Sequence, residues 1–160
     1  MTSNIEFNFE EFENIKVSTK TFIASTNITI DLQKLFDIIN TTDYIVKKKK
    51  RGRRRKTETE EDQNKNLKEG SIITVKWEGN VKGCLLKPQR RNKNGEKTWF
   101  RNSVTIVIFF DKFINFKVCQ SGTLQLTGCK SWSHAEKCVK ELWNIIKNTD
   151  IYTFKNDTKE

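Results

Sequence analysis

Residues 114–131, INFKVCQSGTLQLTGCKS, and the WSHAEKCVKELWNII that follows at 132–146 decide the fold of this chain. Apolar and polar residues alternate within 114–119 and again within 123–127, which is the period of a β-strand with one buried face. Ser121-Gly122 lies between these runs and predicts a tight hairpin turn, because glycine tolerates the positive φ that such turns need. We therefore expect two antiparallel strands with one apolar face and one polar face.

The stretch after the hairpin predicts an amphipathic helix over 132–147. Its apolar residues recur at intervals of three and four, as they do on one face of a helix, and Ser131 stands where a helix cap is expected. They are Ala135, Cys138, Val139, Leu142, Ile145 and Ile146. The helix should cover the apolar face of the sheet and leave the face of Thr, Gln, Asn and Lys side chains open. Such a face suits a ligand, and no side chain on it suggests catalysis.

The rest of the chain predicts further strands and one more helix. Asp31 is the expected cap of a helix over 32–39, and Gly79-Asn80 marks a second hairpin turn. The expected strands are 16–29, 71–78, 81–86 and 104–110. Together these elements predict an α+β fold with one antiparallel sheet and two helices on one of its faces.

The net charge of +10 is concentrated in one segment, KKKKRGRRRK at 47–56. Without its nine cations the rest of the chain is close to neutral, and so dense a run of like charges predicts disorder across 46–70. A role in phosphate contact, in nuclear import or in both is expected. The candidate phosphate contacts are Lys47, Lys48, Lys49, Lys50, Arg51, Arg53, Arg54, Arg55 and Lys56.

The segments outside the predicted core are polar. Residues 1–14 form an acidic N-terminal segment with three phenylalanines, residues 87–98 form a polar loop, and residues 149–160 form a polar C-terminal tail. The domain itself is expected to span 15–148.

Several function classes lack their residue patterns. The cysteines at 84, 119, 129 and 138 include no CxxC pair and His134 is the only histidine, so we predict no metal site and place Cys129 and Cys138 in the core. No nucleophile–base pair, carboxylate cluster or phosphate-binding glycine loop is present, which predicts a protein that is not an enzyme and needs no cofactor. No apolar run approaches the length of about 20 residues that a membrane span requires.

The run SGTLQLTGCKS resembles the signature of the TATA-binding protein repeat, which has Ser-Gly, four residues, then Thr-Gly-Ala-Lys-Ser and a long helix. Thr127-Gly128-Cys129-Lys130-Ser131 departs from it by one Ala-to-Cys change. TFIASTNITIDLQKL at 21–35 is similar to the first strand of the repeat and its following helix. The resemblance covers both ends of one repeat, and the expanded middle is more similar to the TATA-binding-protein-like factors of large DNA viruses than to cellular members.

The resemblance implies a curved antiparallel sheet whose open face binds the minor groove of AT-rich promoter DNA, with apolar wedges that kink the duplex. It places a base-contacting residue at Thr127, and contacts also at Gln125 and Thr123. Lys117 is a further candidate contact because it lies on the open face, where no apolar pattern competes. Its first strand aligns Thr21, Ile23 and Ser25 with DNA contacts, and a shifted register would use Ser18 and Thr19 instead. The two wedge positions fall on Cys119 and Phe100.

Two departures from the family weaken the expected bending and AT selectivity. A wedge must compensate the few kcal/mol that each kinked step costs, and Cys119 is no wedge. Gln125 is polar where the family has a small apolar residue. The chain is therefore expected to be a DNA-binding transcription initiation factor, or else a non-catalytic adaptor of the same fold with only non-specific DNA affinity. A third reading is a substrate-binding appendage of a nucleic-acid enzyme.

One repeat supplies half of the family's saddle and leaves a strand edge unpaired. Either a homodimer or a second repeat in a longer protein would complete the saddle. Double-stranded DNA and a transcription factor B-like protein or RNA polymerase subunits are the expected partners. The resemblance implies a location in the nucleus or in a viral factory of the host cytoplasm, with packaging in the virion as a further option.

Overall fold

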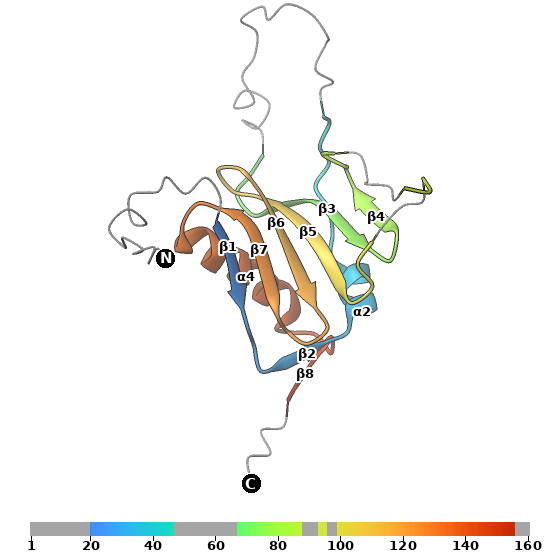
Figure 1. Cartoon of the computed structure of the whole chain (residues 1–160). Helices are drawn as coiled ribbons and strands as arrows, with labels where there is room; N and C mark the ends of the chain where they lie inside the picture. Colours follow the sequence, from blue (N-terminus) through green and yellow to red (C-terminus); the bar gives the residue numbers. More distant parts are fainter. Residues whose placement is uncertain (1–19, 47–66, 88–92, 96–98, 156–160) are drawn as a thin grey trace, which may run out of the picture.

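The computed structural model describes residues 20–46, 67–87, 93–95 and 99–155 (Figure 1). A six-stranded antiparallel sheet has the strand order β1-β7-β6-β5-β3-β4, and β2 pairs with β8 in a separate two-stranded sheet. The elements are β1 (Lys20–Ala24), β2 (Ile28–Ile30), α2 (Leu32–Ile38), β3 (Ser71–Trp77), β4 (Asn80–Gly83), β5 (Ser103–Phe109), β6 (Phe113–Cys119), β7 (Leu124–Cys129), α4 (Trp132–Ile146) and β8 (Tyr152–Phe154).

Both helices lie on one face of the six-stranded sheet, and Figure 1 looks onto the sheet from the opposite side. Phe116, Leu124 and Leu126 point from β6 and β7 into the core, where each is at most 2% exposed. They share that core with buried residues of α2 and α4, such as Leu35 and Leu142. The predicted α+β class, with two helices on one sheet face, is confirmed. Within the described residues, no helix is long and apolar enough to cross a membrane.

Cys129 and Cys138 are both core residues, as predicted. They are 1% and 0% exposed. Burial raises the pKa of the Cys129 thiol, and burial together with the nearby Cys129 and Glu141 raises that of Cys138 to about 12. A thiol with so high a pKa stays protonated at neutral pH, so Cys138 acts as a small apolar side chain.

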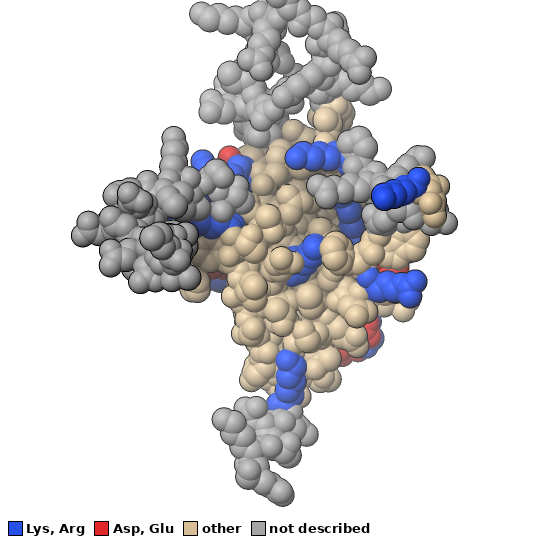
Figure 2. Space-filling model, viewed as in Figure 1, with Lys and Arg blue, Asp and Glu red and all other residues tan. Residues whose placement is uncertain are grey.

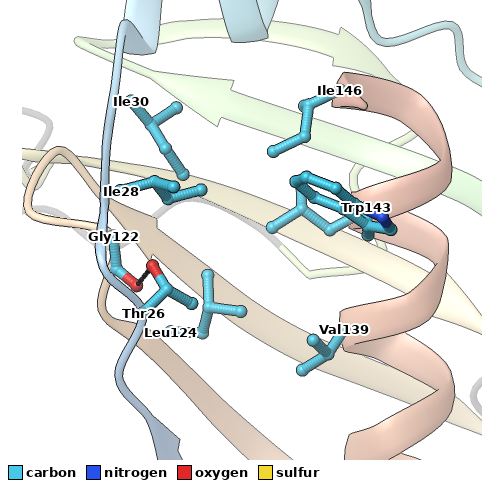
Figure 3. A pocket seen from close by; sticks show the side chains of 9 residues that line it. Thr26, Ile28, Ile30, Gly122, Leu124, Val139, Trp143 and Ile146 are labelled. Atoms are coloured by element: carbon cyan, nitrogen blue, oxygen red, sulfur yellow. Dashed lines mark hydrogen bonds between the residues drawn. The ribbon is translucent and has the colours of Figure 1, made fainter. Parts of the chain in front are cut away.

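The hairpin between β6 and β7 turns through a loop of three residues, 120–122, which includes the predicted Ser121-Gly122. Gly122 has φ +75° and its N–H donates to the Cys119 carbonyl over 2.9 Å. The Thr26 hydroxyl donates to the Gly122 carbonyl over 2.8 Å, so the turn is held against the segment that leads into β2 (Figure 3). The adjoining apolar pocket, bordered by Val139 and Trp143, has a volume of only about 40 Å³.

The prediction of one continuous strand over 16–29 is wrong for its described part. The chain leaves the main sheet after Ala24 and forms β2, which pairs with β8. Residues 151–154, predicted to belong to a polar tail, therefore belong to the fold, and Ile151 is 3% exposed. The apolar residues in Ile151–Phe154 are too few to show a period, and they become a strand only because β2 offers them a partner.

The turn between β3 and β4 lies one residue earlier than predicted. Trp77 pairs with Asn80, so Glu78 and Gly79 are the two central residues of the turn. Their φ values are 45° and 82°, as required by a two-residue hairpin turn with two left-handed positions. Asn80 therefore belongs to β4, and Gly83 ends this strand rather than residue 86.

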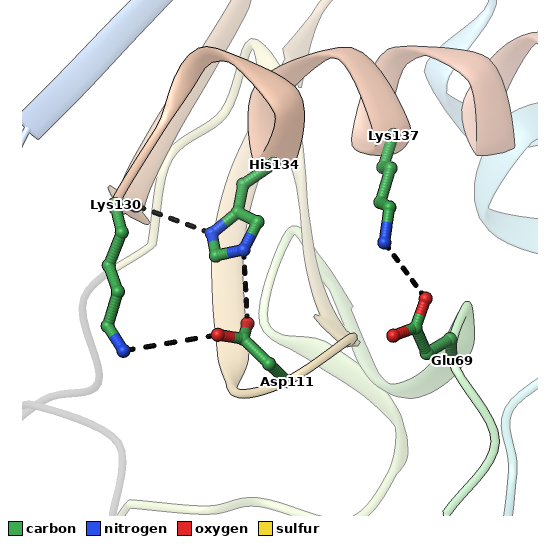
Figure 4. A network of polar contacts seen from close by, with 5 residues as sticks. All are labelled: Glu69, Asp111, Lys130, His134 and Lys137. Atoms are coloured by element: carbon green, nitrogen blue, oxygen red, sulfur yellow. Dashed lines mark hydrogen bonds and ion pairs between the residues drawn. The ribbon is translucent and has the colours of Figure 1, made fainter.

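Only one of the two predicted helix caps, that at Asp31, forms a capping hydrogen bond. Asp31 caps α2 as predicted, because its carboxylate accepts the Lys34 backbone N–H over 3.1 Å. Ser131 occupies the cap position of α4, but its side chain makes no capping hydrogen bond. Instead, the His134 ring accepts the Lys130 backbone N–H over 3.4 Å at Nδ1 and lies 3.2 Å from Asp111 at Nε2 (Figure 4). These contacts join the start of α4 to the turn between β5 and β6.

Candidate nucleic-acid interface

The sheet face opposite the helices carries a continuous cross-strand row of side chains. Ile23 pairs with Gln125, Gln125 with Lys117, and Lys117 with Thr105, so β1, β7, β6 and β5 each contribute one residue. Thr105 in turn pairs with Lys76 of β3. Ile23 is 70% exposed, which is unusual for a large apolar side chain within a sheet. Three predicted contacts, Ile23, Gln125 and Lys117, therefore lie side by side.

A second row runs parallel to the first. Thr21 of β1 pairs with Thr127 of β7, and Thr127 pairs with Asn115 of β6. All three side chains belong to exposed residues. Their hydroxyl and amide groups can donate and accept hydrogen bonds, as readout of base edges in the minor groove requires. The structure thus brings together the predicted contacts Thr21 and Thr127 and adds Asn115, which faces the same way as Lys117.

Ser25, Thr123 and Cys119 lie at one end of these rows. Ser25 and Thr123 stand just outside β1 and β7, next to the Ala24–Leu124 pair. The Thr123 hydroxyl accepts from Ser121 over 3.1 Å, and Cys119 pairs with the buried Ser103. Alternation along β6 puts Cys119 on the same face as Lys117, but its thiol offers neither a cation nor an aromatic ring.

The open face is free of acidic residues along both rows. Lys117 and Lys76 are their two cations, and burial lowers the pKa of Lys76. Figure 2 shows the same side of the molecule, with basic side chains near the middle and around the margin and acidic ones only at the margin. A polar, mildly basic face of this kind is compatible with a polyanion.

Phe100 and Lys117 meet on this face. The Lys117 ammonium lies 3.5 Å from the centroid of the Phe100 ring, which is within the range of a cation–π contact. Phe100 is nevertheless 63% exposed, and the neighbouring Trp99 is 50% exposed. The structure therefore places Phe100 beside the predicted contact Lys117, in front of the first row.

Sequence reasoning missed that part of the open face is covered. Val107 and Phe109 of β5 point away from the helices and yet are 4% and 6% exposed. Phe113 lies 5.3 Å from Phe109 between ring centroids, and the Tyr44 ring lies 5.4 Å from Phe113. The accessible part of the face is thus formed chiefly by β1, β7 and β6. The sequence feature that could have indicated this cover is the aromatic residue Tyr44, three positions before the basic run.

The predicted phosphate contacts of 47–56 lie outside the described residues, but the chain on either side of them is described. Tyr44 contacts Phe113, and the Gly70 backbone N–H donates to the Phe109 carbonyl over 2.8 Å. Both attachment points therefore lie at the Phe109–Phe113 end of the sheet. Tyr44 contacts the open-face residue Phe113, and the basic run begins three positions after Tyr44 in the sequence.

A polar cleft of about 600 Å³ opens at the other end of the sheet, beside the start of α2. It is lined by three carboxylates, Asp31, Glu78 and Asp150, against the two cations Lys34 and Arg101. Lys34 and Asp150 lie 2.6 Å apart, which raises the pKa of the first and lowers that of the second. The excess of carboxylates makes this cleft a poor site for phosphate.

The described residues contain no group of three or more His, Cys, Asp or Glu side chains that could hold a metal ion. The contacts around His134 serve the packing of α4, since its ring is only 15% exposed and lies between Lys130 and Asp111.

Comparisons with protein-family models, with curated proteins and with solved structures found no match to this chain.

Proposed function

We propose that this chain is a DNA-binding transcription initiation factor, built as one TATA-binding-protein-like repeat, that contacts the minor groove of AT-rich promoter DNA. The observation that carries the proposal is the pair of exposed rows on the open face. Ile23, Gln125 and Lys117 form one, and Thr21, Thr127 and Asn115 form the other. Side-chain hydroxyl and amide groups can reach the acceptors that AT pairs present in the minor groove.

The charge distribution supports the same proposal. The rows contain cations and no carboxylate, and the basic run follows three positions after Tyr44, whose ring contacts Phe113 at the edge of the face. Phosphate contacts from such a run supply affinity without sequence preference, whereas the rows supply the preference for AT pairs.

The proposal is tested by a Thr127→Lys, Gln125→Glu double variant. It adds one positive and one negative charge, so the net charge and the non-specific attraction to phosphate stay the same. Losing a minor-groove contact costs roughly 1–3 kcal/mol, so we expect the several-fold preference for an AT-rich over a GC-rich duplex to disappear. Fluorescence anisotropy with both duplexes at two salt concentrations measures this preference. Neither side chain faces the core, so the thermal midpoint should hardly change.

The matched control for this variant is Gln33→Glu with Asn148→Lys, which makes the same charge changes at exposed positions off the open face. Its AT preference should equal that of the wild type. If the Thr127, Gln125 variant also keeps its preference, the open face is not the DNA surface.

The second candidate function is a non-catalytic adaptor that recruits RNA polymerase or a transcription factor B-like protein. An exposed apolar strip on α4 favours it. Trp132 is 71% exposed and Trp143 is 42% exposed, with the half-buried Val139 between them. Exposed aromatic residues that cluster on one element are typical of protein–protein contacts. An adaptor would retain the basic run and bind both duplexes alike.

Self-association through β1 is expected, because β1 is an edge strand of the sheet. Pairing of β1 with its copy about a two-fold axis would join the two open faces and bring together the exposed Trp132 side chains, which contact Phe22 of β1 with ring centroids 5.8 Å apart. Sedimentation should show a dimer that the Trp132→Glu change dissociates and the Phe154→Glu change does not. A wild-type monomer that still shows AT preference would contradict the dimer.

A further inference from the structure

Two neighbouring aromatic side chains near the open face lie outside the hydrophobic core. Phe100 is 63% exposed and Trp99 is 50% exposed, although aromatic rings of this size are usually well buried. A Cβ added to Gly79 would lie 3.6 Å from Trp99 Cε3, so the indole rests against the turn between β3 and β4. We call Trp99 and Phe100 the aromatic platform.

One face of the Phe100 ring is occupied by a cation. The Lys117 ammonium lies 3.5 Å from the ring centroid, so the opposite face and the edge of the ring provide its exposed surface. Lys117 is itself in the first row, directly between Gln125 and Thr105. A flat group that stacks on Phe100 would therefore sit immediately above the proposed DNA-binding face, with a positive charge beneath the ring.

Nucleobases are the flat groups that fit this position. Each base has a π-face, and proteins that hold single strands stack bases on exposed aromatic side chains next to cations that attract the phosphates. The two rows offer Lys117 and Lys76 and no carboxylate, which favours a polyanion over other flat ligands. Arg101, which follows the platform directly, is exposed as well.

The platform is better suited to unpaired than to paired bases. In a duplex the faces of the bases are already stacked on one another, and inserting a ring must first separate them. Side chains that do so are usually large apolar wedges, whereas Cys119, which lies on the same face as Lys117, is small. An unpaired base offers its face without that cost.

We propose that the aromatic platform stacks on unpaired bases, so that the preferred ligand of the open face is AT-rich DNA with an unpaired stretch. This inference rests on the proposed function, because it assigns the DNA to the same face. It extends that function by specifying that part of the bound DNA is unpaired. The rows would contact the paired part, while Trp99 and Phe100 would hold bases that have left the stack.

The test compares three labelled probes of one AT-rich sequence, namely a full duplex, a single strand and a duplex with a central mismatched bubble. The wild-type chain should bind the bubble at least about tenfold more tightly than the duplex, and also more tightly than the single strand, which offers the rows no minor groove. Removing one base–aromatic stack typically weakens binding by about tenfold, so the Phe100→Ala variant should lose this advantage over the duplex. Phe100→Tyr retains a ring and should bind as the wild type does.

Phe154→Ala is the matched control, since Phe154 is 62% exposed but lies on β8, outside the six-stranded sheet. It should leave all three affinities unchanged. Equal affinity of the wild type for all three probes would overturn the proposal. So would a Phe100→Ala variant that matches the wild type, or one that loses affinity for all three probes by the same factor.

Failure of this inference can be told apart from failure of the proposed function. If the Thr127→Lys, Gln125→Glu variant loses AT preference on duplexes while Phe100→Ala has no effect, the minor-groove face holds and the platform proposal is wrong. If Phe100→Ala alone reduces binding of the single strand and bubble, stacking on the platform holds and the minor-groove proposal is wrong. A wild-type chain that binds none of the probes overturns both.

Discussion

The Gly122→Ala variant is expected to lose about 3 kcal/mol or more of its free energy of unfolding, because two independent costs meet at this position. The residue has φ +75°, a left-handed conformation that costs a residue with a side chain roughly 1–2 kcal/mol. In addition, the new Cβ would overlap the Ile28 carbonyl oxygen and the Thr26 hydroxyl. The carbonyl belongs to the backbone of β2 and cannot rotate away.

Relieving that overlap means moving the turn away from β2. Such a movement would break the hydrogen bond from the Thr26 hydroxyl to the Gly122 carbonyl, which is 2.8 Å long. A loss of this size is a large part of the total stability of about 5–15 kcal/mol that single domains have. Urea denaturation followed by circular dichroism measures it.

Gly95→Ala is the matched control for the backbone strain. Gly95 has φ +81°, almost the same as Gly122, but nothing lies within 4 Å of a Cβ added to it. Its replacement should therefore cost only the conformational part, about 1–2 kcal/mol. If Gly122→Ala costs no more than Gly95→Ala, the close approach of β2 to the hairpin plays no part in stability.

The same hairpin shows why part of the fold could be predicted from the sequence. Residues 114–119 and 123–127 alternate with a period of two, and one face of the sheet is buried while the other is open. A shift by one residue would have put Leu126 into water and Gln125 into the core, so the pattern permits one orientation only. The pairing of Gln125 with Lys117 and of Thr127 with Asn115 follows from that orientation and from a loop of three residues, 120–122, between Cys119 and Thr123.

The parts that could not be predicted depend on contacts between distant segments. Residues 25–27 leave the main sheet because β2 finds its partner in β8, more than a hundred residues later. Tyr44 covers part of the open face by contacting Phe113, and Phe100 contacts Lys117 from the short segment that follows the polar loop. None of these segments is long enough to show a period, so only tertiary packing decides where they lie.

In the candidate site, too, the residues on regular strands could be placed from the sequence, and those placed by contacts between distant segments could not. Gln125, Lys117 and Thr127 lie on regular strands for which alternation gave the correct face, whereas Thr21 and Ile23 were expected from the resemblance of the first strand. Asn115 was assigned to the open face by the same alternation, although it was not among the predicted contacts. Its pairing with Thr127 shows that it belongs to the second row.

Replacing the nine cations of 47–56 with serine is expected to have the largest effect on binding. Each phosphate that a cation neutralises releases counterions, and six to ten such contacts change affinity by roughly 10³–10⁵ between 50 and 200 mM salt. We therefore expect the duplex affinity at low salt to fall by about 10³-fold and its dependence on salt to become much shallower. The AT preference, which we assign to the rows, should remain.

The described residues on either side of the segment explain why the fold should tolerate this change. Tyr44 and Gly70 hold the chain at the Phe109–Phe113 end of the sheet through contacts that the substitution does not touch. The thermal midpoint should therefore stay the same. A control that changes every lysine of 47–56 to arginine keeps the charge and should keep both the affinity and the salt dependence. An unchanged salt dependence in the serine variant would mean that the segment does not contact phosphate, and the cations of the face, Lys117 and Lys76, would then have to account for DNA affinity on their own.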